Sequence, residues 1–286
     1  MEYLDEFKEF VNYCNQNGKY VGWGNPNSKI LIVGKESAME EPDESYNSNA
    51  SMWDNHVSND TIMELCHKVE QDVNVAKGWG VNTWSKYQRL KDYIYGSEGF
   101  HNRYVDFPTQ IFTTEINDTP SLRTAQADKS GISSRKELFQ VSSFIQSFPV
   151  IILACSNYIQ NNDNIREIDK IFGVTYDGDD VGRFLFNKGN WFYTHHDASG
   201  RKLVIHTRQL SADVKDDMLK EMAKIIKKQS FAWISRPILL YTLISGLFLQ
   251  GLEGLLQAEN RLYNSLEDSV NRFNILISIF VTGRMK

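Results

Sequence analysis

Cysteine is scarce in this chain of 286 residues. Only three occur, Cys14, Cys66 and Cys155, and none belongs to a C-x-x-C pair. Their odd number and wide spacing exclude a disulfide framework, a structural zinc site and a four-cysteine iron–sulfur cluster. We therefore expect reduced thiols and a cytoplasmic protein.

Membrane and export signals are also missing. The segment Met1–Phe10 is acidic and amphipathic, without the basic and apolar regions of a signal peptide. The apolar run Pro237–Leu249 is shorter than the roughly 20 residues that span a bilayer. A membrane partner is not expected.

Cofactor motifs are lacking too. The chain has no Walker motif, no G-x-S-x-G and no G-x-G-x-x-G. The pair His195–His196 suggests a metal site, but neighbouring residues of a strand point to opposite faces of a sheet. We therefore expect no metal and no cofactor.

Positive charge is not in excess, because the formal net charge is −5. This balance excludes a protein that binds polyanions non-specifically over its whole surface. A nucleic-acid partner would need a local basic face.

Short apolar runs alternate with helical patterns along the first 230 residues, and this order is typical of α/β proteins. We expect residues 1–230 to form a three-layer α/β sandwich with a central, mainly parallel four-stranded sheet. The predicted strands are Lys29–Gly34, Ile111–Thr114, Val150–Ala154 and Lys202–His206, with a hairpin at 183–187 and 190–195. The predicted helices are 3–14, 61–76, 82–95, 133–147, 164–172 and 211–228, with Ser211 as the cap of the last, and 37–60 is predicted as a long loop.

The composition changes after Ser230. Residues 231–286 are rich in Leu, Ile and Phe, which predicts an apolar helical extension used for packing or for homo-oligomerisation. No internal repeat is visible.

The fold predicts where a ligand binds, because sheets of this kind bind ligands at the carboxyl ends of their parallel strands. Those ends are Gly34–Ala38, Thr113–Asn117, Ala154–Asn157 and His206–Ser211. The first and the last carry the chemistry that we expect at the site.

Four side chains at these ends have suitable chemistry. Glu36 can orient or deprotonate a water molecule, and His206 can donate a hydrogen bond to a developing anion. Arg208 and Ser211, with the helix that follows, supply donors for a phosphate. The alternative is structural: Glu36 faces solvent and His206 satisfies a loop carbonyl.

Together these segments resemble motifs of the uracil-DNA glycosylase superfamily. In that family a buried strand ends in Gly-x-Asp/Asn-Pro or Gly-Glu-x-Pro-Gly, similar to Gly34–Ala38. A later strand ends in His-Pro-Ser-Pro-x-Ser, similar to His206–Ser211. Between them, a Thr-Asn-x-x-Lys stretch is similar to Phe112–Asn117, and an apolar strand is similar to Val150–Asn157.

The resemblance implies a DNA-base glycosylase that hydrolyses the N-glycosidic bond of a uracil-type or other modified base. Gly34 would let the backbone approach the ligand, Glu36 would position water, and His206 would stabilise the departing base. The remaining substrate-binding residues implied are Tyr46 and Trp53 for stacking, Thr114 or Asn117 for reading the base, and Arg208 and Ser211 for holding the DNA backbone.

Two other interpretations stay open. Ser37, Thr207 and Arg208 stand where the family has Pro, Pro and Ser, which favours a non-catalytic module that binds nucleic acid, a nucleotide or a protein. An unrelated doubly wound α/β protein is the third interpretation. The helical spacing of Trp79, Trp84 and Tyr87 favours a core role over a surface on which bases stack.

Overall fold

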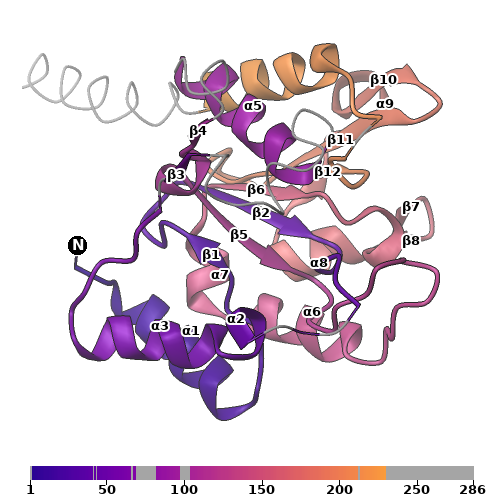
Figure 1. Ribbon diagram of the computed structural model, residues 1–286. Helices are drawn as coiled ribbons and strands as arrows, with labels where there is room; N and C mark the ends of the chain where they lie inside the picture. Colours follow the sequence, from indigo (N-terminus) through magenta and orange to yellow (C-terminus); the bar gives the residue numbers. More distant parts are fainter. Residues whose placement is uncertain are drawn as a thin grey trace, which may run out of the picture. The chain divides into compact units, whose positions relative to one another are not determined.

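Four of the predicted strands lie parallel at the centre of one sheet in the computed structural model of the protein (Figure 1). The structure describes residues 2–40, 42, 44–65, 67–68, 82–96, 104–211 and 213–229. The chain divides into two units, Met1–Gln229 and Ser230–Lys286. The second unit lies outside the described residues, and so does the predicted extension at 231–286.

Short elements alternate along the first unit. Its first half contains α1 (Asp5–Gln16), β1 (Trp23–Gly24), β2 (Ile30–Gly34), α2 (Glu44–Asn47), α3 (Asn49–Ser58), β3 (His67–Lys68), α5 (Thr83–Tyr95), β4 (Tyr104–Val105), η2 (Phe107–Thr109) and β5 (Ile111–Glu115). The remainder contains α6 (Ile132–Val141), α7 (Ser143–Ser147), β6 (Val150–Leu153), η3 (Ser156–Tyr158), β7 (Asn161–Asn162), β8 (Ile165–Arg166), α8 (Glu167–Phe172), β9 (Thr175–Tyr176), α9 (Asp179–Gly182), β10 (Arg183–Asn187), β11 (Asn190–His196), β12 (Leu203–Thr207) and a helix at 216–229.

The parallel core has the order β5-β2-β6-β12, with Ile32 of β2 opposite Thr113 of β5 and Ile152 of β6. The prediction of a mainly parallel α/β sheet is confirmed. The prediction that the sheet has four strands is wrong, because β1 pairs antiparallel with β5, and β11, β10 and β9 extend the other edge to give eight strands. The hairpin predicted at 183–187 and 190–195 forms β10 and β11, and β11 pairs antiparallel with β12. Antiparallel neighbours of this kind need only a short connection.

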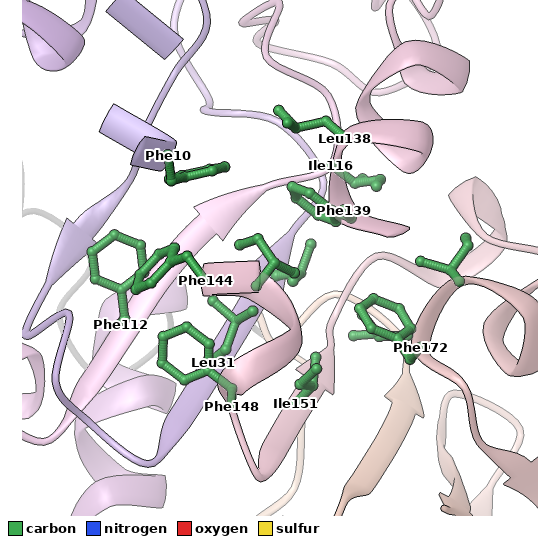
Figure 2. Close-up of a cluster of buried hydrophobic side chains, with 14 of the residues drawn as sticks. Phe10, Leu31, Phe112, Ile116, Leu138, Phe139, Phe144, Phe148, Ile151 and Phe172 are labelled. Atoms are coloured by element: carbon green, nitrogen blue, oxygen red, sulfur yellow. The ribbon is translucent and has the colours of Figure 1, made fainter. Parts of the chain in front are cut away.

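Helices cover both faces of the sheet. Figure 1 shows α5 and the helix at 216–229 on one face and α1, α3, α6 and α7 on the other. Figure 2 shows the second face, where Leu31 and Ile151 from the strands meet Phe112, Phe144 and Phe148. All five side chains are buried, so hydrophobic burial fixes this layer.

The segment predicted as a loop at 37–60 contains two helices, which corrects that prediction. Its many Ser, Asn, Asp and Glu residues favour loops. However, Ala50 and Trp53 lie one turn apart on α3 and are buried in the core cluster. Tertiary packing of this short apolar stripe therefore outweighs the polar composition.

Three other helix boundaries differ from prediction. The helix predicted at 133–147 is broken at Ser142, whose hydroxyl accepts from the Ile145 N–H and begins α7. The last helix begins at 216 rather than at Ser211, because the Asn190 side chain of β11 accepts from the Lys215 N–H. Of the helix predicted at 61–76, residues 61–65 are not helical, 67–68 form β3, and the remainder lies outside the described residues.

Candidate functional site

The carboxyl end of β2 lies where the strand order reverses. The chain passes from β2 to its neighbour β5 and later to β6 on the opposite side of β2. Ligands of open α/β sheets bind in the crevice at such a reversal. Gly34 and Glu36 therefore stand at the position that topology assigns to a ligand.

A cavity of about 670 Å³ opens at this end of the sheet. Its volume lies in the range of small-molecule sites. Predicted residues Gly34, Glu36 and Tyr46 line it, whereas the segment His206–Ser211 contributes only Gln209. The other described lining residues are Tyr20, Trp23, Lys35, Ser37, Ala38, Met39, Ser45, Asn49, Met52, Met63, Glu64, Asn82, Thr83, Trp84, Tyr87, Thr113 and Glu115.

Two stacked aromatic pairs form part of the cavity wall. The rings of Tyr20 and Tyr46 are 4.6 Å apart and 6° from parallel. Those of Trp23 and Trp84 are 4.6 Å apart and 17° from parallel. Flat π-faces of this kind can stack on a planar heteroaromatic ring.

The helical wall is fastened to the edge of the sheet by Asn49 of α3. Its Oδ1 accepts from the Val21 N–H at 3.0 Å and the Gly22 N–H at 3.2 Å, and its Nδ2 donates to the Gly22 carbonyl. The Trp53 Nε1 donates to the same carbonyl at 2.8 Å. Asn49 thus replaces a strand partner for the backbone that precedes β1.

Glu115 is the most perturbed acid of the cavity. It ends β5 opposite Gly34, and its Oε2 is buried without a hydrogen-bond partner among the described residues. Burial and then the Glu36 charge raise the pKa of Glu115 to about 8, although Arg135 opposes the shift. The carboxyl group is therefore mostly protonated at neutral pH and can donate a hydrogen bond or a proton.

Glu36 presents a second carboxylate to the same cavity. The residue is buried, and its Oε1 accepts from the Thr124 hydroxyl at 2.6 Å. Its Oε2 has no hydrogen-bond partner in the part of the chain that the structure describes. One oxygen is thus oriented by Thr124, and the other is buried without a hydrogen-bond partner among the described residues.

Arg135 of α6 supports this arrangement from behind the sheet. The residue is fully buried, and its guanidinium donates to the carbonyls of Glu115 and Tyr20 and to the Thr114 hydroxyl, at 3.1, 2.6 and 2.9 Å. It therefore fixes the end of β5 and the backbone of Tyr20 together.

His206 lies outside the cavity lining. Its Nε2 is 2.9 Å from the Ser156 carbonyl, so this nitrogen carries the hydrogen and donates. Burial lowers the pKa of His206 to about 4, and its Nδ1 is buried without a partner among the described residues. The arrangement matches the structural alternative, in which the imidazole satisfies a loop carbonyl.

Five other predicted residues also lie away from the lining. Trp53 is 1% exposed and packs against Phe7 and Phe112, so it presents no face to a ligand. Three of the remaining side chains donate to backbone carbonyls: Thr114 to Val21, Asn117 to Asp128 and Arg208 to Gly189. The backbone carbonyl of Ser211 accepts from the Val214 N–H.

Sequence analysis missed Glu115, Tyr20 and Trp23, although it named Tyr46 for stacking and weighed Trp84 for the same role. Glu115 falls inside the predicted strand end Thr113–Asn117, but the family resemblance directed attention to Thr114 and Asn117. A carboxylate that ends a buried strand beside another strand-end acid was the available signal. Trp84 and Tyr87 line the cavity as well as packing on Phe107, so core packing was only part of their role.

The two adjacent histidines of β11 have separate partners. His195 and His196 bind different carboxylates, with Nδ1 at 2.8 Å from Asp169 and 2.8 Å from Asp177. No group of three His, Cys, Asp or Glu side chains among the described residues is arranged to hold a metal ion. None of the described helices has the length and apolarity to cross a membrane.

Comparisons of the sequence with protein-family models and with curated proteins matched no family and no protein. The site must therefore be interpreted from its own geometry.

Proposed function

We propose that the protein is a DNA-base glycosylase-like hydrolase that binds a modified base in the cavity and cleaves its N-glycosidic bond. One observation carries the proposal: two carboxyl groups, Glu36 and Glu115, face a cavity whose walls include stacked aromatic pairs. Aromatic faces bind a base by stacking, at about 1–3 kcal/mol per base. A neutral acid beside a second carboxylate can protonate a leaving base.

The two acids have complementary roles in this reaction. Glu36 accepts a proton from water through its unpartnered Oε2, and the water oxygen attacks C1′ of the sugar. The C1′–N bond breaks, its electron pair stays on the base, and Glu115 donates its proton to that base. The products are a free base and a sugar hydroxyl. The proton that Glu36 took from water then returns to Glu115, so that water supplies every added atom and both acids are restored.

A non-catalytic module that binds a base on the same fold is the second candidate. It is favoured by the place of His206, whose Nε2–H is already donated to the Ser156 carbonyl and which does not line the cavity. The charge-stabilising role that the family resemblance implies for His206 has no geometric support here. In this candidate Glu115 recognises the base and Glu36 has no chemical step.

The deciding experiment is a base-release assay on oligonucleotides that carry uracil, hypoxanthine, xanthine or hydroxymethyluracil. We expect release by the native protein and its loss in Glu36→Gln and Glu115→Gln. Glu6→Gln, an exposed position of α1, is the matched control and should retain activity. Binding without release would support the second candidate, and absence of both would overturn the base-binding proposal.

A further inference from the structure

A pair of lysines lies beside Glu36 at the same end of the sheet. The Lys35 ammonium is 5.1 Å from the centre of the Tyr158 ring, and the Lys129 ammonium is 5.6 Å from the same centre. Lys35 follows β2, Lys129 lies in the connection from β5 to α6, and Tyr158 belongs to η3 after β6. Three strand ends therefore bring two positive charges to one aromatic ring.

Lys35 is half-buried and Lys129 is exposed, and both differ from the paired lysines Lys91 and Lys136. Lys91 and Lys136 each have a carboxylate oxygen at 2.7 Å. In the described part of the chain, no carboxylate lies within ion-pair distance of Lys35 or Lys129; the ring quadrupole of Tyr158 is the attraction that both share. An anion such as a phosphate would give these ammonium groups the kind of charge partner that Lys91 and Lys136 have.

The lysine pair is continuous with the cavity. Lys35 and Glu36 both line it, and Glu36 lies close enough to Tyr158 to raise the pKa of its hydroxyl, together with burial. Lys35 thus lines the cavity next to Glu36, whereas Lys129 and Tyr158 lie outside the lining. A nucleotide likewise carries a phosphate on the sugar to which its base is attached.

We propose that Lys35 and Lys129 bind a phosphate of the substrate, so that the substrate is a nucleoside phosphate ester and not a free base or nucleoside. This inference rests on the proposed function for the placement of the base. It transfers the phosphate-holding role to the lysine pair from Arg208 and Ser211, which hydrogen-bond to Gly189 and Val214. It also supplies the local positive charge that a chain of net charge −5 requires.

The test compares Lys35→Gln/Lys129→Gln with Lys8→Gln/Lys224→Gln, which removes the same charge at exposed lysines paired with Asp5 and Glu221. The probes are a fluorescein-labelled single-stranded oligonucleotide with one modified base, the same strand with an abasic site, and the matching nucleoside and 5′-monophosphate. Dissociation constants are measured over a series of salt concentrations. Circular dichroism and thermal melting confirm that each variant is folded.

We expect the Lys35/Lys129 variant to bind both strands at least about tenfold more weakly, because charge-assisted hydrogen bonds to phosphate are lost. The slope of log K against log salt should fall by about 1.4, since a single-strand phosphate contact contributes about 0.7. Lys35→Arg/Lys129→Arg should retain binding. If the variant also binds the 5′-monophosphate more weakly, one phosphate is sufficient for the site. If it binds only the strands more weakly, the lysines recognise the backbone of a nucleic acid.

Equal affinities and slopes for the Lys35/Lys129 variant and its control would overturn the phosphate site. Failure of the base site is a separate result. The abasic strand has phosphates but no base, so its binding tests the lysines alone. Trp84→Ala tests the base site, and one outcome is that it leaves the affinity for the base-containing strand unchanged while the abasic strand still needs the lysines. In that case the base pocket fails and the phosphate site remains.

Discussion

Gly34 and Glu115 are register partners on neighbouring strands, and the Glu115 carboxyl group occupies the space that a side chain at position 34 would need. A Cβ atom built on Gly34 would clash with the Glu115 Oε2. The glycine is therefore what allows an acid to fold back against β2 at the edge of the cavity. Ligand access alone does not explain Gly34.

Gly34→Ala should destabilise the protein by about 1–3 kcal/mol, the usual cost of an overpacked site. The added methyl group forces the Glu115 carboxyl group to move. Glu115→Ala removes the clash, so the double variant should be more stable than the sum of the two single effects predicts. Chemical denaturation of the four proteins measures this coupling, and additive effects would contradict the contact.

Glu115 should make stability fall as pH rises. Its pKa is raised from 4.5 to about 8 in the folded protein, so between these pH values the folded state binds more protons than the unfolded state. The free energy of unfolding must decrease over this window, by on the order of a few kcal/mol. Glu115→Gln should lack this decrease in denaturation experiments at a series of pH values.

Glu36→Gln provides the control for that measurement. It removes the charge that helps to raise the pKa of Glu115, so the fall in stability should still begin near pH 4.5 but should be smaller and end at a lower pH. A pH profile of Glu115→Gln that matches the native protein would show that the acid titrates normally.

His206 should have the opposite effect at low pH. Its pKa is lowered from 6.5 to about 4, so the folded state binds fewer protons in this window and stability is lost as pH falls through it. Because the effect of Glu115 overlaps above pH 4.5, His206→Asn is best compared in the Glu115→Gln background. An NMR titration of the His206 ring near pH 6.5 would contradict the prediction.

Two tryptophans should separate folding from binding. Trp53→Ala should lose about 3–5 kcal/mol of stability, because a fully buried ring leaves a cavity. Trp84→Ala should weaken binding of a base-containing ligand by about 1–3 kcal/mol, with a smaller loss of stability because Trp84 is only partly buried. Thermal melts and ligand titrations of both variants measure the contrast, and reduced ligand affinity in a folded Trp53→Phe variant would contradict it.

The parallel strands could be predicted because each is a short apolar run that ends in a turn, as in Ile30–Gly34 and Val150–Leu153. Their burial on both faces leaves a signal in composition alone. The edges could not be predicted in the same way. β1 has only two residues, and the start of the last helix depends on Asn190, 25 residues away from Lys215.

The location of the site was predictable from topology, whereas its residues were only partly so. Gly34, Glu36 and Tyr46 do line the cavity. Whether a polar side chain at a strand end faces the cavity or the opposite layer depends on the alternation along that strand. Thr114 faces Arg135, and the adjacent Glu115 faces the cavity, so a shift of one residue separates a structural role from a chemical one.

The bonds of Asn49 to Val21 and Gly22 also limit how the site can admit a ligand. Because α3 is joined to the backbone before β1, the wall that includes Asn49 and Met52 cannot swing away from Tyr20 and Trp23 as a separate flap. Widening the cavity on this side requires the edge of the sheet to unzip with the helix. Amide hydrogens of Val21, Gly22 and α3 should therefore exchange with solvent as one cooperative unit, and ligand entry by this route would be slow.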